Sequence, residues 1–204
     1  GFAKSPFRES DAIWEYVQVW YKYANTPEEL SSAQGLPLFS SSFCESPLCY
    51  TKYNLNDFHS DLKDVVFYME PGSLAYNNAL YLTLSAVSVK DGQRTILLSS
   101  SDHGETWKYV GIITDKNDII NPDYPVLTSS ALVEENGKIL LLVSPRCKGS
   151  VGYNRVYTFE FEDISRGKLK RDREGKLIVS KYISPISSEN IGGGQSEYNS
   201  KNFY

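Results

Sequence analysis

Short runs of apolar residues, separated by turn-forming residues, cover most of this chain of 204 residues. Apolar stretches lie at residues 79–84, 95–98, 109–113 and 139–143, and side chains alternate between apolar and polar along residues 155–161. This pattern, with its period of two, predicts β-strands rather than helices. The chain also contains 15 Tyr and 9 Phe, and aromatic side chains favour strands.

Two segments repeat the same order of strand, tight turn and strand. In residues 70–85 the turn is Asn-Asn at 77–78, and in residues 128–143 it is Asn-Gly at 136–137, the dipeptide most typical of a two-residue hairpin. A third and a fourth strand are predicted after each hairpin. The repeating unit is therefore about 60 residues of four strands, which is the size of a large β-propeller blade.

We expect an all-β protein, specifically a β-propeller of four-stranded antiparallel blades. Complete blades are predicted at residues 58–120 and 121–183. A partial blade with its connecting loop is predicted at 1–57, and the start of a further blade at 184–204. Because a propeller needs roughly four or more blades to close, the remaining blades would come from the rest of the protein. A small β-sandwich is the alternative.

The most specific motif lies between the last two predicted strands of the first complete blade. Residues 100–107 read Ser-Ser-Asp-His-Gly-Glu-Thr-Trp, which fits Ser-x-Asp-x-Gly-x-Thr-Trp. Asp102 can accept hydrogen bonds within the turn, and Gly104 tolerates a positive φ. The segment resembles the Asp-box of sialidases and other β-propellers, which joins the third and fourth strands of a blade. The resemblance implies a structural role, on the rim and away from any active site, for Ser100, Asp102, Gly104, Thr106 and Trp107.

The first strand of each propeller blade lines the central channel, so candidate chemistry is expected where blades begin. Glu70-Pro71 resembles the acidic-Pro element that opens blades in five-bladed glycoside hydrolases. Glu197 lies at the predicted start of the last blade, so Glu70 and Glu197 could face one cavity. Glycoside hydrolysis needs such a pair, one group as acid and the other as base or nucleophile. The alternative for each carboxylate is an ion pair at the rim or between blades.

Five further residues near blade starts or strand ends are candidates for contact with a substrate: His59, Asp61, Ser129, Arg146 and Gln195. The second complete blade opens with the neutral segment 128–130, which departs from a pattern with a carboxylate in every blade. A sialidase would require an arginine triad, but no such triad can be assembled from this sequence. Arg94, which leads a strand, is expected to face outward.

Charge and composition narrow the class of partner. The net charge is −4, and the basic cluster at 166–171 is flanked by acidic residues, so we expect a solvated hairpin tip and no nucleic-acid partner. No run approaches the roughly 20 apolar residues of a membrane span. The two histidines lack metal-ligand spacing to the cysteines, and Gly192–Gly194 precede no predicted helix, so neither a metal nor another cofactor is expected.

Cys44 and Cys49 bracket a Pro-containing turn at a spacing that a disulfide could bridge. A disulfide there would indicate an oxidising compartment, as for a secreted, periplasmic or cell-surface protein, whereas two unpaired thiols are the equal alternative. With carbohydrate as the expected partner, the sequence favours a carbohydrate-active propeller, a glycoside hydrolase of oligo- or polysaccharides. The alternative is a non-catalytic propeller that binds glycan or protein.

Overall fold

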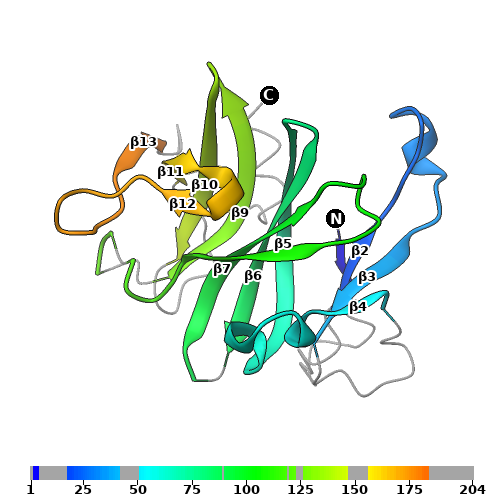
Figure 1. Ribbon diagram of the computed structural model, residues 1–204, viewed down its shortest axis with the longest axis horizontal. Coiled ribbons are helices and arrows are strands. Elements are labelled where there is room, and N and C mark those ends of the chain that lie inside the picture. The colour runs from blue at the N-terminus through cyan, green and yellow to red at the C-terminus, as the bar shows by residue number, and fades with distance from the viewer. Residues whose placement is uncertain are drawn as a thin grey trace, which may run out of the picture.

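The computed structural model describes residues 2–4, 18–41, 51–88, 90–118, 120–122, 126–146 and 156–183. The described strands form three sheets (Figure 1). The first contains β1 (Phe2–Lys4), β2 (Gln18–Tyr21), β3 (Leu36–Ser40) and β4 (Tyr53–Asn54). The second contains β5 (Val65–Tyr76), β6 (Ala79–Ser88), β7 (Gly92–Ser100) and β8 (Lys108–Thr114). The third contains β9 (Val126–Glu135), β10 (Lys138–Arg146), β11 (Val156–Asp163), β12 (Lys168–Leu169) and β13 (Val179–Ile183).

The only helical segments in the described residues are single 3-10 turns: η2 (Glu29–Ser31), η4 (Leu55–Asp57), η5 (Ser60–Leu62) and η6 (Ile164–Arg166). Neighbouring strands of the second and third sheets are antiparallel throughout. In the third sheet, β12 and β13 both pair with β11, so two short strands share the fourth position. The all-β fold class expected from the sequence is confirmed.

Both predicted hairpin turns are present. Asn77 and Asn78 join β5 to β6, and Asn136 and Gly137 join β9 to β10. All four residues have positive φ, between 48° and 73°, as a type I′ turn requires at its two central positions. The turns fix the register of each hairpin, because the residues that flank each turn pair directly with one another.

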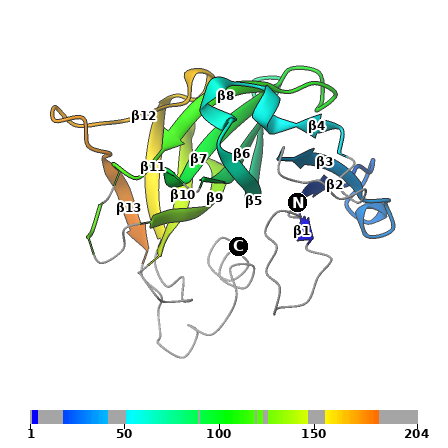
Figure 2. The same cartoon turned by 90° about the horizontal axis from the view of Figure 1, so that it is seen from below.

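The second sheet is buried on both of its faces. In β7, Ile96 and Leu98 pack toward Phe39 of the first sheet, whereas Leu97 packs toward Phe159 of the third sheet. This division follows from the alternation of side chains along a strand. A two-sheet sandwich would leave one face of every sheet open to solvent. Three sheets packed in chain order, as Figure 2 shows, are instead the arrangement of successive propeller blades.

The first strands of the second and third sheets, β5 and β9, approach each other closely at Gly72. A Cβ atom added to Gly72 would lie 2.4 Å from the carbonyl oxygen of Ser130 and 2.8 Å from Cα of Ala131. Only glycine fits such a distance between two backbones. The two sheets are therefore in direct backbone contact along their first strands.

Candidate functional site

Glu70 lies at a β-bulge in β5. Met69 pairs with Ser85 and Gly72 pairs with Thr83, so two residues of β5 oppose a single residue of β6. The φ angle of Glu70 is 57°, in the left-handed region that costs a non-glycine residue about 1–2 kcal/mol. A bulge redirects a side chain, and this one turns the Glu70 carboxyl group into the contact between the second and third sheets.

Side chains from three other strands donate hydrogen bonds to one oxygen of Glu70, Oε2. Ser85 Oγ of β6 lies 2.6 Å from it and Gln93 Nε2 of β7 lies 3.3 Å from it, and the Thr128 hydroxyl of β9 is the third donor. The Glu70 residue is only 9% exposed. Buried polar groups need such partners, and donors from three strands hold the carboxyl group in one orientation.

Glu70 and its donors belong to a polar layer between the two sheets, made of Glu70, Thr83, Ser85, Gln93, Thr128 and Ser130. The hydroxyls of Ser130 and Thr83 share a hydrogen bond of 2.7 Å, and Thr83 donates to the carbonyl oxygen of Gly72 at 3.2 Å. Toward the hairpin turns this layer gives way to packed apolar side chains such as Leu74 and Leu132. The polar layer therefore lies near the end of the sheets where β9 begins.

The third sheet has a bulge at the equivalent place. The pairing of β9 with β10 shifts by one residue between Leu142 and Ser144, so two residues of β9 oppose one of β10. Counted from the two hairpin turns, Ser129 stands in β9 where Glu70 stands in β5. The bulge thus belongs to the repeat, whereas the carboxyl group is particular to the second sheet.

His59 and Asp61 lie together, and their partner is Tyr109 of β8. The His59 ring stacks on the Tyr109 ring with 4.9 Å between centroids, and the Tyr109 hydroxyl donates to Asp61 Oδ2 at 3.1 Å. His59 Nδ1 accepts the backbone N–H of Asp61 at 3.2 Å. Burial and the Asp61 carboxylate raise the pKa of Tyr109, so its hydroxyl remains a donor. No described hydrogen bond joins this group to the polar layer.

Arg94 is buried, contrary to the expectation that it faces outward, with 7% of its residue surface exposed. Its guanidinium donates to Asp64 Oδ1 at 2.6 Å and also to the carbonyl oxygen of Asp61. Burial acts to raise the pKa of Asp64, but hydrogen bonds from Ser88 and Arg94 outweigh it, and the pKa is lowered. Arg94 therefore anchors the segment that leads into β5, a role that the strand pattern alone did not reveal.

The turn at 100–107 is held together by Asp102. Its carboxylate accepts hydrogen bonds from the hydroxyl and the backbone N–H of Thr106 and from the hydroxyl of Ser100. These bonds, those from Thr106 first, lower the pKa of Asp102 to about 2. Gly104 has a φ of 90°, and its carbonyl oxygen accepts the indole N–H of Trp107 at 3.1 Å.

The same turn contacts the first sheet. The Trp107 ring meets Phe39 of β3 edge to face, with 5.9 Å between ring centroids. Lys52 Nζ donates to the carbonyl oxygen of Glu105 at 2.8 Å, and the Tyr53 hydroxyl of β4 donates to the same oxygen. The turn therefore links the second sheet to the first.

Several predicted residues lie outside the described ones, namely Glu197, Gln195, Cys44 and Cys49. The backbones of Ser129 and Arg146 are described in β9 and β10, but their side chains are not. In the described part of the chain, no three His, Cys, Asp or Glu side chains gather as metal ligands. No helical segment there is long and apolar enough to cross a membrane.

No protein-family model matches the sequence, and no curated protein matches it. Among solved structures, the chain is similar to a GH43_1 enzyme from Xanthomonas citri, with 13% identity over 57% of this chain and 34% of that chain and a TM-score of 0.42. A family 117 glycoside hydrolase from Zobellia galactanivorans has 14% identity, covering 50% of this chain and 37% of that chain, with a TM-score of 0.43. The GH32 β-fructofuranosidase of Bombyx mori has 14% identity, covering 82% and 34% respectively, with a TM-score of 0.43.

The chain thus spans about a third of the length of these enzymes. Likeness at this level assigns neither a substrate nor a catalytic residue to this chain. The class of fold rests on its own strand topology, which is that of four-stranded antiparallel sheets packed as propeller blades.

Proposed function

We propose that this chain is part of a carbohydrate-active β-propeller, a glycoside hydrolase of oligo- or polysaccharides in which Glu70 is one of two catalytic carboxyl groups. The observation that supports the proposal is the placement of Glu70 at a bulge in a first strand, with donors on three other strands. Hydrolysis of a glycosidic bond uses carboxyl groups held on either side of that bond.

The support around Glu70 suits a reacting group. A catalytic side chain must be held close to its productive geometry by its neighbours, and local backbone strain is frequent at functional sites. Glu70 has both features, because its φ is positive and its carboxyl group is fixed by Ser85, Gln93 and Thr128. Ser129 has the equivalent position without a carboxyl group, so we assign the second catalytic group to another blade.

Glu197 is the proposed second carboxylate, with Gln195, Ser129 and Arg146 as substrate contacts at the same channel mouth. In this proposal residues 58–120 and 121–183 are whole blades, whereas 1–57 and 184–204 belong to neighbouring blades. The turn at 100–107 is an Asp-box like that of sialidases, with a structural role on the rim, where it joins the third and fourth strands of a blade. Glycan hydrolysis by such a protein is consistent with a secreted, periplasmic or cell-surface location.

A non-catalytic propeller that binds glycan or protein is the second candidate, and one observation favours it. The three donors among the described residues all bind Oε2 of Glu70, and the Glu70 residue is only 9% exposed, so its carboxyl group also links four strands of two sheets. A carboxyl group that only links strands has a structural role and takes no part in catalysis. Because the two candidates differ in turnover, they are separable by experiment.

The test is turnover by the whole protein on a panel of neutral oligosaccharides and aryl glycosides, read as product mass. We expect product from at least one substrate and a loss of about 10²-fold or more in Glu70→Gln and in Glu197→Gln, the size of general acid–base catalysis. Glu135→Gln is the matched control, because Glu135 is exposed near the β9–β10 turn.

If no substrate gave product while all variants were folded, the proposal of a hydrolase would be replaced by that of a non-catalytic binding propeller. Product formation that survives in Glu70→Gln would remove Glu70 from the chemistry. A loss of turnover that merely follows a loss of folded protein would assign Glu70 a structural role, so each variant is also compared by its urea unfolding midpoint.

A further inference from the structure

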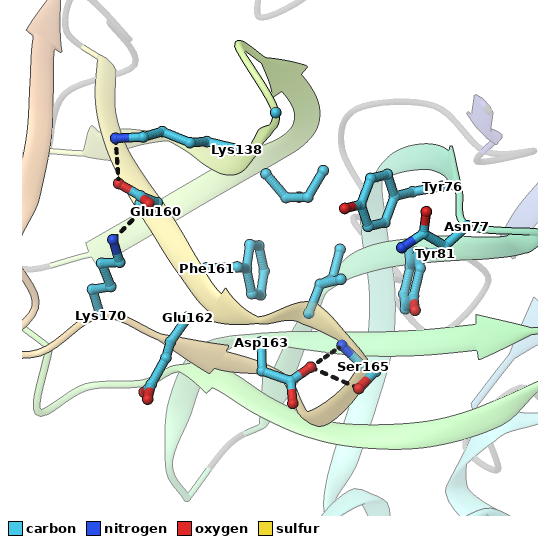
Figure 3. Close-up of a pocket in the computed structure, with 13 residues that line it drawn as sticks. Tyr76, Asn77, Tyr81, Lys138, Glu160, Phe161, Glu162, Asp163, Ser165 and Lys170 are labelled. Atoms are coloured by element: carbon cyan, nitrogen blue, oxygen red, sulfur yellow. Dashed lines mark hydrogen bonds and ion pairs between the residues drawn. The ribbon is translucent and has the colours of Figure 1, made fainter.

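A cavity of about 490 Å³ opens between the second and third sheets near their hairpin turns (Figure 3). Its walls come from the β5–β6 hairpin, the β9–β10 hairpin and the segment from β11 to Lys170. Tyr76 in this cavity lies six residues after Glu70 on β5, which at about 3.3 Å per residue places the two roughly 20 Å apart. The cavity is therefore separate from the polar layer.

One wall of the cavity is aromatic. Figure 3 shows Tyr76 and Tyr81 on one side, with the buried ring of Phe161 between them and the opposite wall. Among the described residues, neither tyrosine hydroxyl has a hydrogen-bond partner, and neither does the side-chain amide of Asn77, which also lines the cavity. Burial first, and then the charge of Asp163, raise the pKa of Tyr81, so its hydroxyl stays protonated at neutral pH.

The opposite wall is charged, but its cations are already paired. Lys138 and Lys170 both bind Glu160, at 3.2 Å and 2.6 Å. Those two bonds, the one from Lys170 first, lower the pKa of Glu160. Glu162 and Asp163 add two further carboxylates to the cavity lining. Carboxylates therefore outnumber lysines around the cavity, and an anionic ligand would be repelled.

We propose that this cavity is a non-catalytic binding site for a neutral sugar unit of an oligosaccharide, with one ring face against Tyr76 and its hydroxyls toward Tyr81, Asn77 and Asp163. A sugar ring combines an apolar face of C–H groups with a rim of hydroxyls. The cavity combines an aromatic wall with polar side chains: Tyr81 and Asn77 lack hydrogen-bond partners within the described residues, and Asp163 accepts hydrogen bonds from Ser165. An apolar peptide side chain in the same place would leave those polar groups buried without hydrogen bonds, which is costly.

The test is titration calorimetry of the whole protein with neutral xylan-, glucan- and galactan-derived oligosaccharides, and with galacturonate oligosaccharides as acidic probes. Glu70→Gln protein is used in parallel, because it reports binding under conditions in which the proposed hydrolysis is blocked. We expect Tyr76→Ala to weaken binding of a neutral oligosaccharide about fivefold in both backgrounds, since an aromatic contact of this kind contributes about 1 kcal/mol.

Tyr76→Phe retains the ring and should lose less affinity than Tyr76→Ala, which also provides a variant if the alanine protein fails to fold. Tyr23→Ala is the matched control, because Tyr23 is 74% exposed and does not line the cavity. Unchanged affinity in Tyr76→Ala, preference for the acidic probes, or no binding of any neutral probe would overturn the inference. Because the experiment measures affinity rather than turnover, its result tests the binding site independently of the proposed hydrolase activity.

Discussion

Replacement of Gly72 by alanine tests the close contact between β5 and β9. An ideal Cβ atom at this position would lie 2.4 Å from the Ser130 carbonyl oxygen and 2.8 Å from both Ala131 Cα and Thr83 Oγ1. Two of these three atoms belong to the backbone of β9, so neither can rotate away. Since an ordinary carbon–oxygen contact is about 3.3 Å, β5 and β9 would have to separate by roughly 0.9 Å.

The energetic cost follows from that separation. Inserting a methyl group into a packed interface costs about 1–3 kcal/mol, and the backbone clash places Gly72→Ala at the upper end. A gap of this size would also weaken the hydrogen bonds that cross from β9, from Ser130 to Thr83 and from Thr128 to Glu70. We expect the free energy of unfolding to fall by about 3 kcal/mol, a factor of about 100 in the folding equilibrium.

The assay is urea unfolding followed by tryptophan fluorescence, with Gly35→Ala as the matched control. The nearest atom to a Cβ at Gly35 is Trp20 Cε3 at 3.5 Å, an ordinary van der Waals contact, so this variant should change stability by less than about 0.5 kcal/mol. If Gly72→Ala unfolded within about 0.5 kcal/mol of the wild type, β5 and β9 would not be in backbone contact, and the blade arrangement would be refuted.

Three further variants test individual contacts by urea unfolding midpoints. Asp102→Asn should destabilise the protein at neutral pH. The fold lowers the pKa of Asp102 from an ordinary value of about 3.9 to about 2, so the stabilisation by its carboxylate is complete above about pH 4 and is lost as the pH drops through 2. The difference in unfolding midpoint between Asp102→Asn and the wild type should therefore disappear near pH 2. A gap that stays constant between pH 5 and pH 2 would contradict this. Thr128→Val keeps the side-chain shape but removes one donor to Glu70, and should lower the free energy of unfolding by about 1–2 kcal/mol. An unchanged unfolding midpoint would contradict a stabilising bond between the two sheets at this position. Arg94→Met should cost about 2 kcal/mol, less than for a fully buried pair because the Asp64 side chain is 37% exposed, and wild-type stability would show that the pair contributes nothing.

Local chemistry allowed much of the fold to be predicted from the sequence. The predicted hairpin turns at 77–78 and 136–137 are present, because turn geometry depends on the residues in the turn itself. Asp102 holds its own turn for the same reason. The two bulges were not predicted, because a bulge is defined by the pairing of two strands. The residues Glu70-Pro71 and Ser129-Ser130 alone do not indicate which residues they oppose.

The contacts of the candidate site were less accessible to sequence reasoning, because they join distant parts of the chain. Glu70 was placed on a first strand, but its bond to Thr128 spans 58 positions and depends on how two sheets pack. Arg94 was expected to face outward, yet the segment before β5 folds over it and supplies Asp64 as its partner. The cavity near Tyr76 could not be predicted from the sequence, because residues from three separate segments of the chain line it.

Chemical rescue of Glu70→Gly most directly tests the claim that Glu70 is a catalytic carboxylate. Glycine accepts the φ of 57° without strain, so this variant removes the carboxyl group while leaving the bulge intact. We predict that turnover of an aryl glycoside falls about 10²-fold or more and that added formate restores it in proportion to its concentration, by supplying a carboxylate at the vacated position. A folded Glu70→Gly protein that retains the wild-type rate without formate would contradict the claim.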